Sequence, residues 1–522
     1  MRTPLQLKLR LAVAAVVAIL GLAACGGSGG DGGAGLPSRP ALDASYRASG
    51  HALSGDVFVH LFEWRWTDIA SECENQLGPK GFKAVQISPP QEDIVAAPWW
   101  TRYQPVSYNI DQSRSGTRAE FIDMVNRCRA AGVDIYADAV INHMTAGSGT
   151  GRNGTVYGKY TYPGLYAQSD FHTPCSIDNY RDAANVQDCE LVGLADLDTA
   201  SASVRQKIAD YLAGLMRLGV AGFRLDAAKH IQPVELNEIL TLVDQTLAGE
   251  GRALPYYFAE VIDYGGEAIT TRDYFGLGYL SGAASDITEF KFHGVSDKFL
   301  GTGGQRIAQL NPNGSAGNQF SETAWGIMPA DKAVVFLENH DTQRSGGISY
   351  RDGVVYRLAN VWMLAQPYGY PSVMSGYAFD RTTQAGRDAG PPAAGPGCAS
   401  SLESAAIGQW VCEHRDPVIA RMIAFRRAVA GTAQTNWWDN GANAIAFSRG
   451  DKGFVAINRE TAALSRTFST GLAAGTYCDV LGGGVVAGVC VGQAITVAAN
   501  GNASATLAAG TALVLQQGVG IP

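Results

Sequence analysis

The chain has 522 residues, of which 46% are hydrophobic and 9% aromatic. That is more than one compact core usually holds, and it predicts two or three domains. The net charge of −8 leaves no basic excess of the kind that binds nucleic acid or anionic lipid. We therefore expect a neutral or weakly charged substrate and no nucleic-acid partner.

Residues 1–25 are typical of an export signal. Basic residues precede the run LAVAAVVAILGLAA, which is shorter than the roughly 20 residues that a membrane span needs. The run ends in LAAC, which resembles a bacterial lipobox and predicts lipidation of Cys25. The alternative is ordinary signal cleavage with an incidental Cys25. Residues 26–45, rich in Gly and Ser, then predict a flexible tether, so the only membrane contact that we expect is a lipid anchor.

Nine cysteines suit an exported chain, because setting Cys25 aside leaves eight that can all pair. Their number does not fix the connectivity, but their placement favours local pairs. These pairs are Cys175–Cys189, Cys398–Cys412 and Cys478–Cys490, which leaves Cys73 for Cys128. No CxxC pair or Cys/His cluster occurs in the sequence, which argues against a zinc site.

From about residue 55, short apolar runs alternate with helical stretches. The runs are DVFVHLFEW, FKAVQIS, VDIYADAVINH, GFRLDAAKH, YYFAEV, AVVFLENHD and GYPSVMS. Strands that recur between helices predict a parallel sheet, and seven or eight such units over about 375 residues favour a (β/α)8 barrel. A doubly wound dinucleotide-binding sheet is disfavoured, because no GxGxxG follows any run.

Two segments depart from this alternation. Residues 143–197, rich in Gly, Tyr, Asn and Asp, are too long for a connecting loop and predict a small inserted domain after the third strand. The barrel then comprises residues 46–142 and 198–430. Beyond it, residues 431–522 contain Gly-punctuated alternating segments such as AIAFSRG and GFVAIN, which predict a C-terminal antiparallel β-sandwich.

Polar side chains follow several apolar runs, at the strand ends that form the active site in barrels of this type. A single carboxylate there is usually a cap or half of an ion pair. Asp226, Glu260 and Asp341 would converge from three strands on one face, and crowded like charges are costly unless they are used. Arg224 shares a strand face with Asp226 and favours its ionised form. Glu260 ends the more apolar run YYFAEV, where desolvation favours a protonated carboxyl.

The segments DAVINH, GFRLDAAKH, FAEV and ENHD resemble, in order and spacing, the motif regions of the α-amylase family, glycoside hydrolase family 13. RYQPVSYNI, NWWDNG and the eight cysteines resemble the animal-type members and their bacterial relatives. The resemblance covers residues 46–515 and implies endo-acting, retaining hydrolysis of α-1,4-glucosidic bonds in starch and glycogen. We expect a monomer located outside a bacterial cell or at its envelope.

Two other functions stay open. One is a maltooligosaccharide-forming or transglycosylating enzyme of the same family, which the size of early products would distinguish. The other is a non-catalytic glucan-binding surface lipoprotein. Such a protein would be expected to have lost at least one of Asp226, Glu260 and Asp341, and all three are present.

The resemblance also implies roles for individual residues. Asp226 would be the nucleophile, Glu260 the acid/base and Asp341 the carboxylate that stabilises the distorted sugar. A retaining mechanism needs its two working carboxyls about 5–5.5 Å apart. The implied substrate contacts are Trp100, Tyr103, Gln104, His143, Arg224, Lys229, His230 and His340. For Trp99, plain packing is as good an explanation as sugar contact.

The resemblance implies a calcium ion that joins the inserted domain to the barrel. Calcium takes oxygen donors, and no EF-hand pattern is present in the sequence. The implied ligands are Asn142, Gln187, Asp196 and His230. The alternative interpretation makes Asn142 and Asp196 ordinary turn residues.

A chloride ion is a further possibility that the family comparison raises. Chloride-activated members hold the anion with the equivalents of Arg224 and Asn339 and with a third, basic residue. Ser372 stands at that third position, so the anion would lose a charge-assisted contact. We therefore expect little or no chloride requirement.

Overall fold

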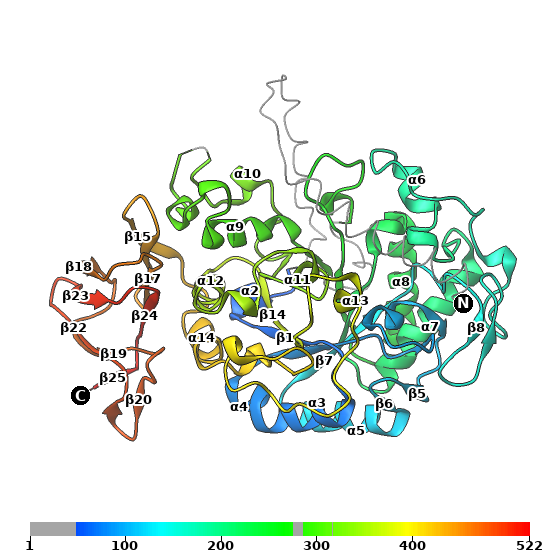
Figure 1. Ribbon diagram of the computed structural model, residues 1–522, viewed down its shortest axis with the longest axis horizontal. Helices are drawn as coiled ribbons and strands as arrows, with labels where there is room; N and C mark the ends of the chain where they lie inside the picture. The colour runs from blue at the N-terminus through cyan, green and yellow to red at the C-terminus, as the bar shows by residue number, and fades with distance from the viewer. Residues whose placement is uncertain (1–47, 275–284, 316, 522) are drawn as a thin grey trace.

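The computed structural model describes residues 48–274, 285–315 and 317–521. The predicted export signal, the whole of the predicted tether and Cys25 lie outside these ranges. No helix within them is long and apolar enough to cross a membrane. Figure 1 shows a central barrel, with β8 (Gly149–Thr150) and α6 (Ala183–Asp188) at one end of the molecule and the C-terminal strands at the other.

Eight parallel strands close into the predicted barrel. In order around it they are β1 (Phe58–Leu61), β2 (Ala84–Ile87), β7 (Asp134–Ala139), β10 (Gly222–Leu225), β11 (Tyr256–Ala259), β12 (Ser285–Thr288), β13 (Ala333–Val335) and β14 (Tyr370–Ser375). Seven of them lie in the runs that predict strands. The sequence patterns miss β12, because its sequence SDIT is short and polar although all its residues are buried.

Helices follow the strands and cover the outside of the barrel. The longer ones are α3 (Trp66–Glu72), α5 (Arg118–Ala130), α7 (Ala202–Arg217), α8 (Pro233–Gly249), α9 (Gly294–Leu300), α12 (Val354–Ala365) and α14 (Pro417–Ala428). Their starts follow local sequence signals. Thr117 and Glu120 form a capping box at α5, while Pro233 and Pro417 begin α8 and α14, where the missing N–H costs nothing.

The lower end of the barrel is closed by packed rings. Phe58, Tyr136, Phe258 and Tyr370 belong to a buried cluster of the strands. The short helix α2 (His51–Ser54) packs beneath them, and the ring of His51 stacks on Tyr370 with centroids 4.2 Å apart. These rings close this end of the barrel, so a substrate site is expected at the carboxyl-terminal ends of the strands.

The chain between β7 and α7 makes the predicted excursion from the barrel. It contains β8, β9 (Val156–Tyr157) and α6. The excursion begins and ends at one point, because His143 and Asp196 form a β-bridge and Leu197 N–H donates to Asn142 O at 3.0 Å. The inserted segment thus returns its last residues to the end of β7, next to the strands that carry the carboxylates.

The C-terminal part is an antiparallel sandwich, as predicted. One sheet has the order β15 (Gln434–Asp439), β16 (Ala444–Arg449), β17 (Gly453–Asn458) and β24 (Thr511–Gln516). The other has the order β18 (Leu464–Ser469), β23 (Asn502–Leu507), β22 (Ala494–Val497), β19 (Gly475–Cys478) and β25 (Gly520–Ile521). Side chains such as Phe454, Phe468 and Leu515 form the buried core of the sandwich.

All four predicted disulfides are present. The structure pairs Cys73–Cys128, Cys175–Cys189, Cys398–Cys412 and Cys478–Cys490. The first joins α5 to the helical turn after α3, and the second closes the outer part of the inserted segment. Disulfides persist in oxidising compartments, so four of them suggest an exported protein.

Candidate active site

A single guanidinium links three carboxylates at the rim of the barrel. Arg224 of β10 lies in register with Asp138 of β7 and Phe258 of β11. Its Nη1 donates to Asp138 Oδ1 and to Asp226 Oδ1, each at 2.7 Å, and its Nη2 donates to Glu260 Oε1. The Arg224 side chain is only 5% exposed. Three acids from neighbouring strands therefore share one buried cation.

This excess of acid over base changes the titration of the carboxyls. Burial raises the pKa of Asp226 well above its usual range, and the charges of Glu260 and Asp138 add to the effect, while Arg224 lowers it. Arg224 favours the ionised form of Asp226, as its place on the strand predicts, but burial has the larger effect on this pKa. Burial likewise raises the pKa of Asp138 to about 6. Asp226 and Asp138 thus retain protons up to higher pH than free carboxyls do.

The surroundings of Glu260 differ from the apolar ones that YYFAEV predicts. Its Oε1 accepts from Arg224, and its Oε2 accepts the backbone N–H of Ala227 at 3.0 Å. Ala227 has φ 49°, a left-handed conformation that costs a residue with a side chain about 1–2 kcal/mol. This unusual turn, at the start of the short helix η5 (Ala228–His230), aims an N–H at the carboxyl.

Asp341 is the most open of the three predicted catalytic acids. The exposed fractions of the side chains are 9% for Asp226, 7% for Glu260 and 35% for Asp341. Asp341 precedes α11 (Thr342–Ser345), and its backbone N–H donates to Asn339 Oδ1 at 3.0 Å. A ligand in the site can reach this carboxylate without displacing protein.

Aromatic rings form one wall of the site. The ring of His340 stacks on Tyr103, with centroids 5.1 Å apart, and Tyr103 OH donates to Asp138 Oδ2 at 2.9 Å. Trp99 packs edge-on against His340, with centroids 5.5 Å apart, and this contact leaves both packing and sugar contact open for Trp99. Trp100 follows it in the turn η2 (Trp99–Tyr103), with a buried indole nitrogen that finds no hydrogen-bond partner among the described residues.

Two predicted substrate histidines are neutral and engaged with protein. His143 Nε2 lies 3.0 Å from Tyr103 O, and its Nδ1 lies 3.3 Å from the amide of Asn142. His230 Nδ1 donates to Val186 O at 2.9 Å. Burial lowers the pKa of both His143 and His230 to about 4. Both ring nitrogens of His143 thus have partners, which the sequence does not reveal.

The other predicted contacts lie nearby on ordered loops. Lys229 Nζ donates to Ile262 O at 2.7 Å and forms an ion pair with Glu267. Gln104 Oε1 accepts the backbone N–H of Ala146 at 3.2 Å, which joins the wall of the site to the inserted segment. Glu267 belongs to no motif, so sequence reasoning did not single it out.

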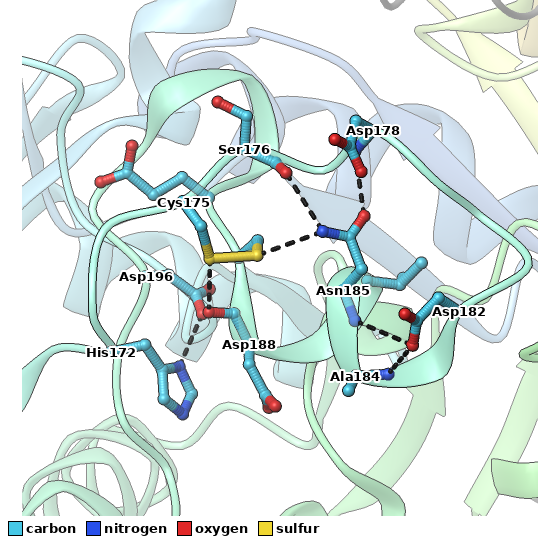
Figure 2. The surroundings of a disulfide bond; sticks show 12 residues. His172, Cys175, Ser176, Asp178, Asp182, Ala184, Asn185, Asp188 and Asp196 are labelled. Atoms are coloured by element: carbon cyan, nitrogen blue, oxygen red, sulfur yellow. Dashed lines mark hydrogen bonds and ion pairs between the residues drawn. A yellow bond between two sulfur atoms is a disulfide. The ribbon is translucent and has the colours of Figure 1, made fainter.

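Two of the predicted calcium ligands touch each other at the base of the inserted segment. Asn142 Nδ2 donates to Asp196 Oδ1 at 3.2 Å, and both residues are buried. Asp196 Oδ2 also lies 2.7 Å from His172 Nδ1 (Figure 2). Burial raises the pKa of Asp196 to about 7, against the opposing effects of His172 and Asn142. Sequence reasoning missed His172 because it lies outside every motif.

The other two predicted ligands are Gln187 of α6 and His230 of η5. The two elements are joined by the hydrogen bond from His230 Nδ1 to Val186 O. Gln187 Nε2 donates to Tyr274 OH at 3.1 Å, so its side-chain oxygen and its backbone carbonyl are both available as oxygen ligands. Within residues 48–274, 285–315 and 317–521, no three His, Cys, Asp or Glu side chains converge on a possible metal position. A cation here would be held by one carboxylate, that of Asp196, together with amide and backbone oxygens, which are donors that suit calcium.

The predicted anion position coincides with a small cavity under the carboxylates. Its volume is about 30 Å³, and its lining includes Arg224, Glu260, Asn339 and Ser372. Among the described residues that line this cavity, Arg224 is the only Arg or Lys. A cavity of this size holds a water molecule, and Ser372 lies in its wall as the sequence comparison predicts.

A closed (β/α)8 barrel whose rim gathers carboxyls around one cation, followed by a β-sandwich, is typical of a glycoside hydrolase. Comparison with known families gives the particular one. The model described as "Alpha amylase, catalytic domain" matches residues 81–377, and the model described as "Alpha amylase, C-terminal all-beta domain" matches residues 435–518. The chain belongs to the α-amylase family.

Its relatives come from animals and bacteria. The chain is 45% identical over 480 residues to an α-amylase of Tenebrio molitor, covering 89% of this chain and 96% of the relative. It is 45% identical over 462 residues to an α-amylase of Streptomyces violaceus, covering 88% of this chain and 74% of the relative. It is 43% identical over 481 residues to pancreatic α-amylase 2a5 of Mus musculus, covering 86% of this chain and 91% of the relative.

A solved structure of a relative has the same fold. A variant of α-amylase I from Eisenia fetida, in complex with maltohexaose, superimposes with a TM-score of 0.79 at 36% identity. The match covers 88% of this chain and 97% of that one. The likeness therefore includes the barrel and most of what surrounds it.

Proposed function

We propose that the protein is an endo-acting α-amylase that hydrolyses α-1,4-glucosidic bonds in starch, glycogen and related glucans with retention of configuration. The observation that carries this proposal is the pair of bonds from Arg224 to Asp226 and to Glu260. One guanidinium can span two carboxyls only when they are close, and a retaining mechanism needs a separation of about 5–5.5 Å.

In the proposed first step, Asp226 attacks the anomeric carbon while Glu260 protonates the leaving oxygen. Arg224 holds Asp226 through Oδ1, so we assign the attack to Oδ2. The bond from the anomeric carbon to the leaving oxygen breaks, and a glycosyl ester with Asp226 forms. In the second step Glu260 takes a proton from water, whose oxygen attacks the anomeric carbon and releases Asp226.

We propose Asp341 as the third carboxylate, which binds the distorted sugar, and we keep the predicted substrate contacts. These are Trp100, Tyr103, Gln104, His143, Arg224, Lys229, His230 and His340. His340 is well placed, because its Nε2 lies 3.4 Å from Asp341 Oδ2 and burial lowers the pKa of its ring well below the usual range. His143 can contact a sugar hydroxyl through Nε2 only if that hydroxyl replaces the carbonyl of Tyr103.

Incubation of the purified protein with starch tests the proposal, with products resolved by size. An endo-acting enzyme gives a broad range of chain lengths early in the reaction. A single short product from the start would favour the maltooligosaccharide-forming alternative, and longer products than the substrate would favour transglycosylation. No cleavage at all would overturn the proposal in favour of a glucan-binding lipoprotein.

We propose a calcium ion held by the side chains of Asn142 and Asp196 and the backbone carbonyls of Gln187 and His230. The residues fit calcium, because the donors are hard oxygens and the one carboxylate, Asp196, is buried. When bound, the ion supplies a cross-link between the inserted segment and the barrel rim. It takes no part in the bond cleavage itself.

Removing calcium should lower both stability and activity. An ion present at 100 times its dissociation constant stabilises the fold by about 2.7 kcal/mol, so a chelator should lower the melting temperature measurably. Adding Ca²⁺ back, but not Mg²⁺, should restore it. Asp196→Asn should lose the calcium response. Asp178→Asn, which alters an exposed residue of the same segment, should keep it. An unchanged melting curve in chelator would refute the calcium site.

Chloride should have little effect on hydrolysis. We propose that Arg224 alone cannot hold the anion, because it already donates to three carboxylates and Ser372 adds no charge. The rate in chloride-free buffer should change less than about twofold on addition of NaCl, a bound that follows from the missing charge-assisted contact. A large activation would contradict this. Ser372→Arg is the matched variant that should gain a chloride response.

We propose that the protein is an exported monomer with a lipid anchor at Cys25. The four disulfides support the export. We also propose the domain division predicted from the sequence. It consists of the signal in residues 1–25, the tether in residues 26–45, the barrel in residues 46–142 and 198–430, the inserted domain in residues 143–197 and the C-terminal domain in residues 431–522.

A further inference from the structure

The loop after β11 presents an aromatic ring beside the proposed acid. Tyr264 follows Glu260 closely in the chain and is 43% exposed. Among the large apolar side chains that are exposed in the described residues, it is the one aromatic. A single exposed ring is not unusual in itself, but a Tyr ring beside catalytic carboxyls presents both an apolar face and a hydroxyl to a ligand.

The ring rests on the wall of the site. Tyr264 packs edge-on against Phe290, with centroids 5.8 Å apart and planes at 78°. Phe290 packs edge-on against Phe336 at 5.2 Å. Phe336 in turn lines the cavity that Arg224 and Glu260 share. Edge-to-face contacts thus connect Tyr264, through Phe290, to Phe336 in the lining of the cavity.

The backbone on the N-terminal side of Tyr264 is fixed by buried contacts. The carboxyl of Asp263 is 1% exposed, and its Oδ2 accepts from Lys291 Nζ at 3.0 Å. The carbonyl of Ile262 accepts from Lys229 Nζ at 2.7 Å. Because these contacts hold the loop, ordering Tyr264 on a ligand would cost little conformational entropy.

The phenol group lies within electrostatic range of the catalytic acids. Partial burial, together with the charges of Asp341 and Glu260, raises the pKa of Tyr264 to about 12. The hydroxyl therefore stays protonated at neutral pH and can donate a hydrogen bond. Lys229 of η5 forms an ion pair with Glu267 of this loop and donates to its Ile262 carbonyl, so polar groups suited to sugar hydroxyls belong to the same part of the site.

We propose that Tyr264 is a stacking platform for the glucosyl unit on the leaving-group side of the scissile bond. This inference rests on the proposed function. Glu260 protonates the oxygen that leaves, so the loop that continues from Glu260 borders the leaving sugar. The apolar face of a pyranose packs on an aromatic ring, while Lys229 and Glu267 face the hydroxyls at its edge. The same platform holds the acceptor when a sugar replaces water in the second step.

Two substrates that differ only on the leaving side test this placement. Maltoheptaose places glucosyl units on both sides of the scissile bond, whereas α-maltotriosyl fluoride leaves only fluoride on the leaving side. Tyr264→Ala should lower kcat/KM for maltoheptaose by roughly tenfold, the upper range for loss of a ring contact. It should leave kcat/KM for the fluoride within about twofold, because that substrate makes no contact there. Tyr264→Phe, which keeps the ring, should resemble the wild type on both substrates.

Equal losses on the two substrates would overturn the platform, because they would place the ring on the other side of the bond or give it a structural role. Unchanged kinetics on both would overturn it as well. A wild-type protein that releases neither sugars nor fluoride would instead overturn the proposed function, and the inference with it. The measurements therefore separate failure of the platform from failure of the amylase assignment.

Discussion

Glu260→Gln should lower kcat for starch by about 10²–10⁴-fold, the usual contribution of general acid–base catalysis. The amide has nearly the same shape as the carboxyl, although its single oxygen can accept from Arg224 or from the Ala227 N–H but not from both. It has no acidic proton for the leaving oxygen and cannot activate water. The fold should remain, so the loss measures chemistry and not unfolding.

Two readouts distinguish this role from a structural one. Fluoride leaves without protonation, so Glu260→Gln should still form the glycosyl ester from α-maltotriosyl fluoride. Azide needs no general base, so it should accelerate turnover of the variant and yield an α-glycosyl azide. Glu250→Gln, at a partly exposed ion pair with Arg217, is the matched control and should match the wild type. Starch hydrolysis by Glu260→Gln at the wild-type rate would refute the assignment.

Arg224→Lys should damage catalysis more than its conserved charge suggests. Lys cannot span two carboxyls as a guanidinium does, so at least one charge-assisted hydrogen bond to Asp226 or Glu260 is lost. Such a bond is worth about 1.5–3 kcal/mol, and each 1.36 kcal/mol is about tenfold. We therefore expect kcat/KM to fall by roughly 10- to 100-fold.

The same variant should shift the pH dependence. Arg224 lowers the pKa of Asp226, although burial raises it overall. A weaker contact lets that pKa rise further, and a nucleophile must be ionised. The acid limb of kcat/KM should therefore move to higher pH. The control is Arg217→Lys, because Arg217 is 41% exposed and its pair with Glu250 should contribute under about 1 kcal/mol. An unchanged pH profile would show that Arg224 does not tune Asp226.

The sequence was sufficient for most of the fold, because apolar periodicity and local signals carry it. Seven strands coincide with apolar runs, and the spacing of the cysteines indicates all four disulfides. The sequence patterns did not predict β12, because its residues are mostly polar and are buried only through their place in the closed barrel. Only closure of the barrel requires a strand there.

The site was predictable as a set of residues but not as a set of contacts. The motifs place Arg224 near Asp226, yet its bonds to Asp138 and Glu260 depend on the register of three strands. The left-handed turn at Ala227 has no Gly or Asn to indicate it. Tyr264 belongs to no motif, and its exposure follows from packing.

The most direct measurement of the central claim is peptide mapping of the glycosyl-enzyme. Glu260→Gln is incubated with α-maltotriosyl fluoride, quenched in acid and digested, and the peptides are examined by mass spectrometry. We expect one maltotriosyl group, attached to the peptide that contains Asp226. An unmodified protein that nevertheless releases fluoride, or a label on a peptide without Asp226, would contradict a retaining mechanism through this carboxylate.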